Sequence, residues 1–382
     1  MNHDDRRKRL NSICHLPPLA SLASGGSLVS CHPLLYTQLM LKTFLRIGIN
    51  TIIGAVLIYF WYKLVDIREV WQVLAGFNLL LLIPATALMI LASVFKAYRF
   101  KLLLARVVSV PAMRIINLTF LSQLLSFTIP VRIGEVAKGV YLSSEYGLHF
   151  GRAVVWVFLD RFLDFWAVLG LSLVLLLVVP TSLPQSLTSS LFIAALVASS
   201  LVVFVVLKPE LFKGLVNILS HLMVLKSLKK RFLTLGFFII ECFSLLKGGV
   251  WHSLGLLILT VAAVISEALC WYLLMSAFIP GLSVLKVWLG SMLNALTFLI
   301  PAAPGYVGSA EAAGLAVFTY GLGLDKTYVS AATVIFHAIS LVFILATGII
   351  GLYALKFNLG LVWKKLKTKS KMSKSKLQMS NE

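Results

Sequence analysis

Residues 151–180 read GRAVVWVFLDRFLDFWAVLGLSLVLLLVVP, and this stretch decides the class of fold. It is long enough to cross a bilayer, which takes about 20 mostly apolar residues in a helix. Asp160, Arg161 and Asp164 interrupt it, and each such charge costs about 2.5–3.5 kcal/mol near the centre of a membrane helix. The stretch is therefore typical of a membrane helix whose charged side chains face protein or a hydrated cavity instead of lipid.

The same composition extends over most of the 382-residue chain. Hydrophobic residues make up 59% and charged residues 13%, whereas about a quarter of the residues in soluble domains are charged. Apolar runs recur from about residue 47 to residue 355, which excludes a soluble enzyme with a single anchor. We expect an all-α polytopic membrane protein, with one integral membrane domain over residues 40–355. A disordered extension at 1–39 and a basic, disordered tail at 356–382 would flank it.

The formal net charge of +20 lies in the gaps between the apolar runs. This placement argues against nucleic-acid binding and favours positive-inside signals and contacts with anionic lipids. When residues 1–46, 96–114, 145–152, 208–249 and 356–382 share one side, that side holds 27 of the 34 Lys and Arg residues, and the opposite connectors hold three. We therefore predict a multi-pass membrane protein with both termini in the cytoplasm.

This orientation requires that two short apolar segments, residues 115–149 and 287–324, turn back before they cross the membrane. Simple counting gives 8–10 membrane helices. We interpret them as six full spans plus two re-entrant hairpins of broken helices. Each hairpin could instead be a pair of full spans, which would leave every other connector on the same side of the membrane.

The two short segments resemble each other. Residues 122–130, SQLLSFTIP, align with residues 293–301, LNALTFLIP, and each proline is followed by glycine and glutamate. Chance similarity between Leu- and Phe-rich strings is the alternative explanation. Copies that enter from opposite faces would form an inverted repeat with halves of about 46–207 and 208–355, and such repeats place a substrate site near the midplane. The residues expected to break the helices are Pro130, Gly134, Pro301, Pro304, Gly305 and Gly308.

The charged residues beside the helix breaks are candidates for binding a lipid headgroup. Arginine can bind a phosphate through two hydrogen bonds, whereas lysine acts as a point charge. The candidate headgroup cations are Arg132, Lys138 and Arg161. The acids expected to balance these cations or to gate the cavity are Glu135, Asp160, Asp164 and Glu311. Glu267 and His337 are secondary candidates.

Structural roles are open for the same residues. The charges in 160–164 could serve only to lock helix packing, with Arg161 paired to Asp164 three residues later. Arg132 could belong to an ordinary cytoplasmic loop, and Glu311 could cap the amides of the helix that follows it.

Other classes of function lack a signal. The four cysteines form no metal or redox motif, and no phosphate-binding loop pattern occurs. Ser309 and His337 would suit an intramembrane serine protease, but no nucleophile motif surrounds Ser309. We expect no metal, no cofactor and no nucleic-acid partner.

Three motifs together resemble the membrane-embedded region of lysylphosphatidylglycerol synthase (multiple peptide resistance factor) and its stand-alone relatives. The motifs are Pro130-x-Arg132-x-Gly134-Glu135-x-x-Lys138, Asp160-Arg161-x-x-Asp164 and Pro301-x-x-Pro304-Gly305-x-x-Gly308-x-x-Glu311. With the pattern of spans, the resemblance covers about Leu41 to Leu355. Three positions depart from the family pattern: Asp160 stands where Glu is usual, Tyr306 where a small residue is common, and His337 where Arg is frequent.

The resemblance implies a flippase or transporter that moves a phosphate-bearing lipid across the bacterial cytoplasmic (inner) membrane, with aminoacylated and polyprenyl lipids as open alternatives. Because a lysine-rich tail follows Leu355 in place of a soluble aminoacyl-transferase domain, aminoacyl transfer is not expected of this chain. A membrane transferase acting on lipid-linked aminoacyl or sugar groups is the alternative, as is a non-transporting envelope scaffold. The expected partners are membrane lipids, either anionic phospholipid or polyprenyl phosphate. A homodimer and a separately encoded lipid-modifying enzyme are open possibilities.

Overall fold

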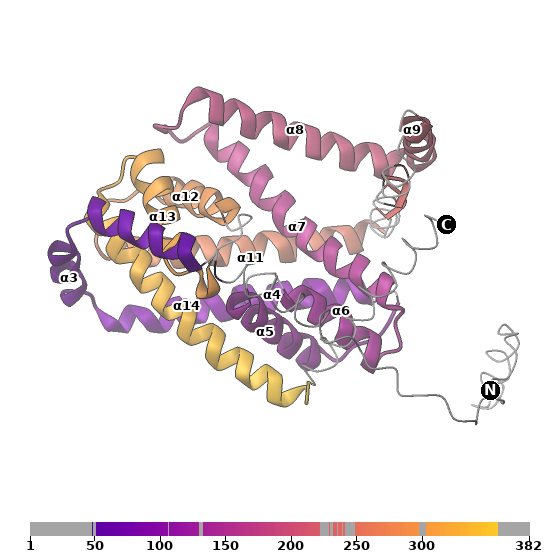
Figure 1. Ribbon diagram of the computed structural model, residues 1–382, viewed down its shortest axis with the longest axis horizontal. Helices are drawn as coiled ribbons and strands as arrows, with labels where there is room; N and C mark the ends of the chain where they lie inside the picture. Colours follow the sequence, from indigo (N-terminus) through magenta and orange to yellow (C-terminus); the bar gives the residue numbers. More distant parts are fainter. Residues whose placement is uncertain are drawn as a thin grey trace, which may run out of the picture. The chain divides into compact units, whose positions relative to one another are not determined.

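The computed structural model describes residues 48, 51–105, 107–129, 133–221, 229, 232–234, 236–238, 240, 249–297 and 303–357. The predictions for the extension at 1–39 and for residues 358–382 of the tail lie outside this part of the chain. Pro130, Arg132 and Pro301 also lie outside it. Every regular element within the described ranges is a helix, as Figure 1 shows, which confirms the all-α class.

The helices to which the structure gives bounds lie between residues 51 and 354. In chain order they are an unlabelled helix at Thr51–Leu64, α3 (Ile67–Ala75), η1 (Leu79–Leu81), α4 (Leu82–Leu104), α5 (Ala112–Thr128), α6 (Ile133–Glu145), α7 (Phe150–Leu176), α8 (Gln185–Leu207), α9 (Pro209–His221), α11 (Val250–Ser276), α12 (Val284–Thr297), η2 (Pro304–Tyr306), α13 (Ser309–Gly314), the π-helical η3 (Leu315–Gly321) and α14 (Lys326–Ala354).

In the part of the chain that the structure describes, three helices are long and apolar enough to cross a membrane, at Leu79–Leu104, Trp251–Ser276 and Lys326–Ala354. A helix of 26 residues, the length of the first two, rises about 39 Å at 1.5 Å per residue, whereas the hydrocarbon core is about 30 Å thick. Large apolar side chains are exposed on their outer faces, and Val342 of α14 is 66% exposed. Such faces suit contact with acyl chains, and the chain is a membrane protein.

α4 is longer than the sequence predicts. The charge pattern ends this span at residue 95 and assigns Lys96 and Arg99 to a cytoplasmic loop, but the helix continues to Leu104. The loop assignment is therefore wrong for residues 96–104. Ser93, Lys96 and Arg99 recur every three residues and so share one face of α4. The helix tolerates these charges because that face is turned toward acids on α7 and α11.

α5 and α6 form the first hairpin, in which the two helices lie side by side (Figure 1). Glycine makes their close approach possible, because a Cβ atom at Gly134 would lie 1.9 Å from the carbonyl oxygen of Ser122. α6 packs on the N-terminal half of α7, where Gly139 faces Val154. α5 packs on the C-terminal half of α14, where Gly348 faces Leu124.

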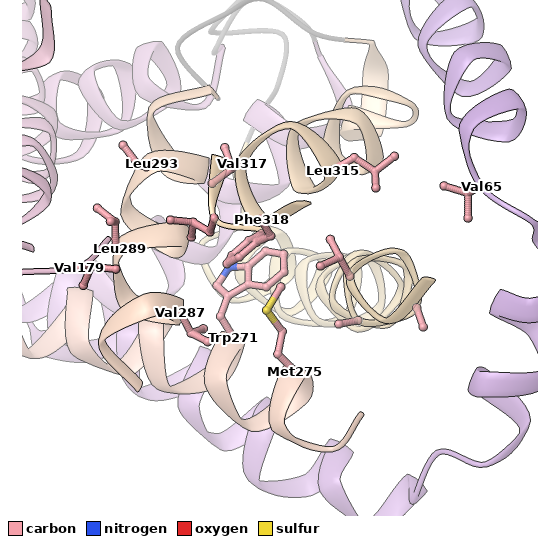
Figure 2. Close-up of a cluster of buried hydrophobic side chains, with 14 of the residues drawn as sticks. Val65, Val179, Trp271, Met275, Val287, Leu289, Leu293, Leu315, Val317 and Phe318 are labelled. Atoms are coloured by element: carbon pink, nitrogen blue, oxygen red, sulfur yellow. The ribbon is translucent and has the colours of Figure 1, made fainter. Parts of the chain in front are cut away.

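α12, α13 and η3 form the second hairpin. A Cβ atom at Gly290 would lie 2.1 Å from the ring of Phe318, so glycine again permits the contact. Figure 2 shows Phe318 among the apolar side chains of this region, with Trp271 and Met275 of α11 pointing toward it. This hairpin packs on the opposite ends of the same two long helices. Met292 of α12 packs with Val168 in the C-terminal half of α7, and Gly314 of α13 faces Thr333 in the N-terminal half of α14.

α4 and α11 pack against each other with opposite directions. The sulfur of Cys270 lies 3.6 Å from the carbonyl oxygen of Ala85 at one end of the contact. Near the other end, Leu102 approaches Gly255. The two hairpins and the antiparallel long helices together enclose the polar side chains described next.

Candidate functional site

Six charged side chains form one continuous network between α4, α6 and α7. Its members are Arg99, Glu135, Lys138, Asp160, Arg161 and Asp164. The side chains of Arg99 and Asp160 have no exposed surface at all. Charges at such a depth require partners, because an unpaired buried ion is far less stable than the same ion in water.

Arg99 connects both aspartates of α7. Its Nε and Nη2 atoms donate to Oδ1 of Asp160 at 3.0 and 2.7 Å, and Nη2 also donates to the backbone oxygen of Asp160 at 3.0 Å. Its Nη1 atom donates to Asp164 and, at 3.4 Å, to the hydroxyl of Thr260 on α11. One guanidinium group therefore ties α4 to α7 and α11.

Arg161 and Lys138 complete the network on its other side. Arg161 donates from Nη2 to Oδ2 of Asp160 at 2.7 Å and lies 3.1 Å from Asp164, so the predicted Arg161–Asp164 pair is confirmed. Its Nε lies 3.4 Å from Glu135. The Lys138 ammonium lies 3.5 Å from Asp160 and 3.8 Å from Glu135, with the ring of Phe100 5.0 Å away. α6 is thereby fastened to α7.

The network is electrically balanced, with three cations and three acids, and each member contacts at least two of opposite charge. Sequence reasoning named five of the six. It missed Arg99, although the spacing of Ser93, Lys96 and Arg99 on one helical face was a readable signal.

A second polar cluster lies at the break of the second hairpin. Glu311 accepts a hydrogen bond from the backbone N–H of Gly308 at 2.8 Å and so caps α13. Capping is one of the roles that the sequence left open for this residue. Its other carboxylate oxygen lies 2.6 Å from Nδ1 of His337, and Nε2 of His337 lies 2.7 Å from the carbonyl oxygen of Gly305. His337 on α14 thus links the acid to the backbone turn.

The turn itself has a strained backbone. Gly305 and Gly308 have φ of 70° and 80°, and Tyr306 has φ of 58°, which is uncommon for a residue with a side chain. A Cβ atom at Gly308 would lie 2.2 Å from the carbonyl oxygen of Gly54. The ring of Phe127, near the end of α5, lies 5.9 Å from that of Tyr306. The ends of the two hairpins therefore meet here.

Ser309 and His337 do not pair as a protease would require. The hydroxyl of Ser309 donates to the carbonyl oxygen of Tyr306 at 2.8 Å, while His337 contacts Glu311 and Gly305. Within the described ranges, no group of three or more His, Cys, Asp or Glu side chains is placed to hold a metal ion.

A cavity of about 430 Å³ lies between α4, α5, α7, α11, α12, η2 and α14. Four charged side chains line it, Lys96, Arg161, Asp164 and Glu267. Lys96 on α4 and Glu267 on α11 form an ion pair, and their side chains are 16% and 42% exposed. The remaining wall combines polar groups with a large aromatic surface, made by Phe127, Phe165, Trp271, Tyr306, Phe336 and Phe343.

The predicted residues separate into three places. Arg161, Asp164 and Glu267 line the cavity. Glu135, Lys138 and Asp160 belong to the network, and none of these three is among the residues that line the cavity. Glu311 and His337 hold the turn of the second hairpin, beside Tyr306. Sequence reasoning missed Lys96, because it read this residue as part of a loop.

A protein family model matches the chain. Its description is Lysylphosphatidylglycerol synthase TM region, and the match covers residues 47–348. This range includes every described residue of the network, the second cluster and the cavity. The comparison with curated proteins finds no match to the chain.

Proposed function

Because the chain belongs to the lysylphosphatidylglycerol synthase TM region family, we propose that it moves a phosphate-bearing lipid between the leaflets of the bacterial inner membrane. The cavity of about 430 Å³ at the meeting point of both hairpins is the observation that carries this proposal. A charged headgroup cannot cross hydrocarbon unaided, because an isolated ion costs tens of kcal/mol in a medium of low dielectric constant. Charged and polar side chains in the wall of this cavity would lower that cost, while the acyl chains stay in lipid.

The proposed architecture is an inverted repeat of six full spans and two re-entrant hairpins, with both termini in the cytoplasm. Its support is geometric. The first hairpin packs on the N-terminal half of α7 and the C-terminal half of α14, and the second hairpin packs on the other two halves. α4 and α11, which precede the hairpins, run antiparallel. Gln123 and Asn294, aligned in the sequence repeat, both line the cavity.

In this mechanism the network positions the cavity wall. Arg161 presents part of its guanidinium group to the lipid headgroup. Asp160 and Glu135 hold the guanidinium group in place. Lys138 fastens α6 to α7 instead of touching the lipid, because its ammonium is enclosed between Asp160 and Glu135. Arg132, one residue before α6 in the sequence, is a further proposed headgroup contact. Glu311 and His337 keep the second hairpin broken beside the cavity.

The test is leaflet exchange of labelled phospholipids in vesicles that contain the purified protein. Wild type should exchange lipid faster than protein-free vesicles, and Arg161→Ala should slow exchange. Arg68→Ala removes an exposed arginine on α3 and should leave the rate unchanged. Equal rates for wild type, Arg161→Ala and protein-free vesicles would contradict the proposal. A lipid-linked product formed without leaflet exchange would favour the transferase instead.

A further inference from the structure

We infer that the headgroup binds by replacing the Lys96–Glu267 ion pair, and that the preferred headgroup is zwitterionic, with one phosphate and one ammonium group. This inference rests on the proposed function and names the substrate class. It assigns a binding role to Lys96 and moves the centre of the site from α6 and α7 to the contact between α4 and α11.

The Lys96–Glu267 pair is the exchangeable one. Within the described residues, Lys96 has an ion pair with Glu267 alone, and Glu267 with Lys96 alone. Members of the network have two or three such partners each, and Asp160 contacts Arg99, Lys138 and Arg161. The Glu267 side chain is also 42% exposed, more than any side chain of the network. A ligand that enters the cavity meets this pair with the fewest contacts to break.

Charge balance selects the class of headgroup. Lys96 and Arg161 line the cavity together with Asp164 and Glu267, so the charged side chains of its wall sum to zero. An anionic headgroup that bound Lys96 would take the counter-charge from Glu267 and place a second negative charge near it, which is unfavourable because like charges repel. A zwitterionic headgroup gives its phosphate to Lys96 and its ammonium to Glu267, so neither side chain is left unpaired.

Neutral polar side chains that line the same cavity suit the same ligand. Asn294 is 3% exposed, and its side-chain oxygen has no hydrogen-bond partner within the described residues. The hydroxyl of Ser126 is likewise buried and without a partner there. Both residues line the cavity. An amide oxygen can accept from an ammonium group, and a hydroxyl can donate to a phosphate oxygen.

The experiment compares two labelled lipids with identical acyl chains in vesicles that contain the protein. Phosphatidylethanolamine carries both a phosphate and an ammonium group, whereas phosphatidylglycerol carries only the phosphate. Wild type should exchange phosphatidylethanolamine about tenfold faster, because specificity is the difference between two binding free energies. Glu267→Gln keeps the size of the side chain but removes its charge, and should bring the two rates together. Glu210→Gln, in the exposed Lys213–Glu210 pair of α9, is the matched control and should leave the ratio unchanged.

A double replacement separates binding from folding. Lys96→Met with Glu267→Leu removes both charges at once, so no unpaired ion is left, and such replacements are often neutral for stability. The double variant should unfold at the temperature of wild type but lose the fast exchange of phosphatidylethanolamine.

Equal wild-type rates for the two lipids, or a ratio that Glu267→Gln leaves intact, would overturn the inference while the proposed function stood. No exchange of either lipid by wild type would instead remove the proposed function itself. If the double variant does not fold, the ratio measured for Glu267→Gln decides alone.

Discussion

Arg99 donates two hydrogen bonds to one carboxylate oxygen of Asp160, at 3.0 and 2.7 Å, and neither side chain has any exposed surface. The two residues are 61 positions apart in the sequence. Their contact joins α4 to α7 and makes a charged stretch of membrane helix compatible with hydrocarbon on its other faces. It is the most deeply buried contact of the network.

Removal of Arg99 should destabilise the protein strongly. Arg99→Met leaves Asp160 and Asp164 with fewer counter-charges in a buried site, and breaking a buried ion pair by removing one partner costs about 3–5 kcal/mol. Unfolding in detergent, followed by the denaturant midpoint, measures this change. Arg152→Met, an exposed arginine on α7, is the control and should leave the midpoint unchanged. Equal midpoints for the two variants would show that the network does not hold these helices together.

A methyl group at Gly134 should force the first hairpin apart. The new Cβ atom would meet the carbonyl oxygen of Ser122 at 1.9 Å, and backbone atoms cannot move aside easily. Gly134→Ala should therefore cost about 1–3 kcal/mol, as overpacking typically does. At Gly170 in α7 the added atom meets nothing within 4 Å, so Gly170→Ala should be as stable as wild type. The same unfolding midpoint tests both, and a fully stable Gly134→Ala would refute the close packing of α5 on α6.

The proposed topology predicts a definite labelling pattern, which would be the same if each hairpin were a pair of full spans. Single cysteines at Met113 and Glu145 stand at the two ends of the first hairpin, and cysteines at Ser283 and Lys326 flank the second; all four positions are exposed. In a background without the native cysteines, an impermeant thiol reagent should label the first two from the cytoplasmic side only and the last two from the outer side only. Labelling of Met113 and Glu145 from opposite sides would mean that α5 and α6 together cross the membrane.

His337 should hold the turn of the second hairpin closed. His337→Leu removes the contacts to Glu311 and to Gly305, and a hydrogen bond to a charged group contributes about 1.5–3 kcal/mol. Amide hydrogen exchange in residues 305–312 should speed up about tenfold or more, since local opening becomes easier. Tyr353→Leu, exposed on α14, is the control. Unchanged exchange in His337→Leu would mean that the turn is fixed by its packing on Gly54 alone.

Much of the fold follows from local features of the sequence. Short apolar runs that end at proline predict helices at 115–129 and 287–300, and the structure has α5 at 112–128 and α12 at 284–297. A helix interior cannot continue through proline without losing a hydrogen bond, so Pro130 predicts from the local sequence where α5 ends. The charges inside residues 151–180 likewise indicate a buried polar site, because a charged side chain in a membrane helix needs an oppositely charged partner or a hydrated cavity.

The partners of those charges could not be read in the same way. Arg99 and Lys96 look like residues of a loop, because a sequence window sees only that the apolar run stops. Their acids, Asp160 and Glu267, are 61 and 171 positions away. Such pairings depend on how α4 packs against α7 and α11, and a single sequence holds no direct record of that packing.

The most direct test of the central claim is to fill the cavity and measure lipid exchange. Ser340 of α14 lines the cavity, whereas Val342 on the same helix is 66% exposed. In vesicles, Ser340→Trp should reduce the leaflet exchange of labelled phosphatidylethanolamine to the rate of protein-free vesicles, and Val342→Trp should exchange it as fast as wild type. Wild-type exchange by a folded Ser340→Trp variant would show that headgroups do not pass through this cavity.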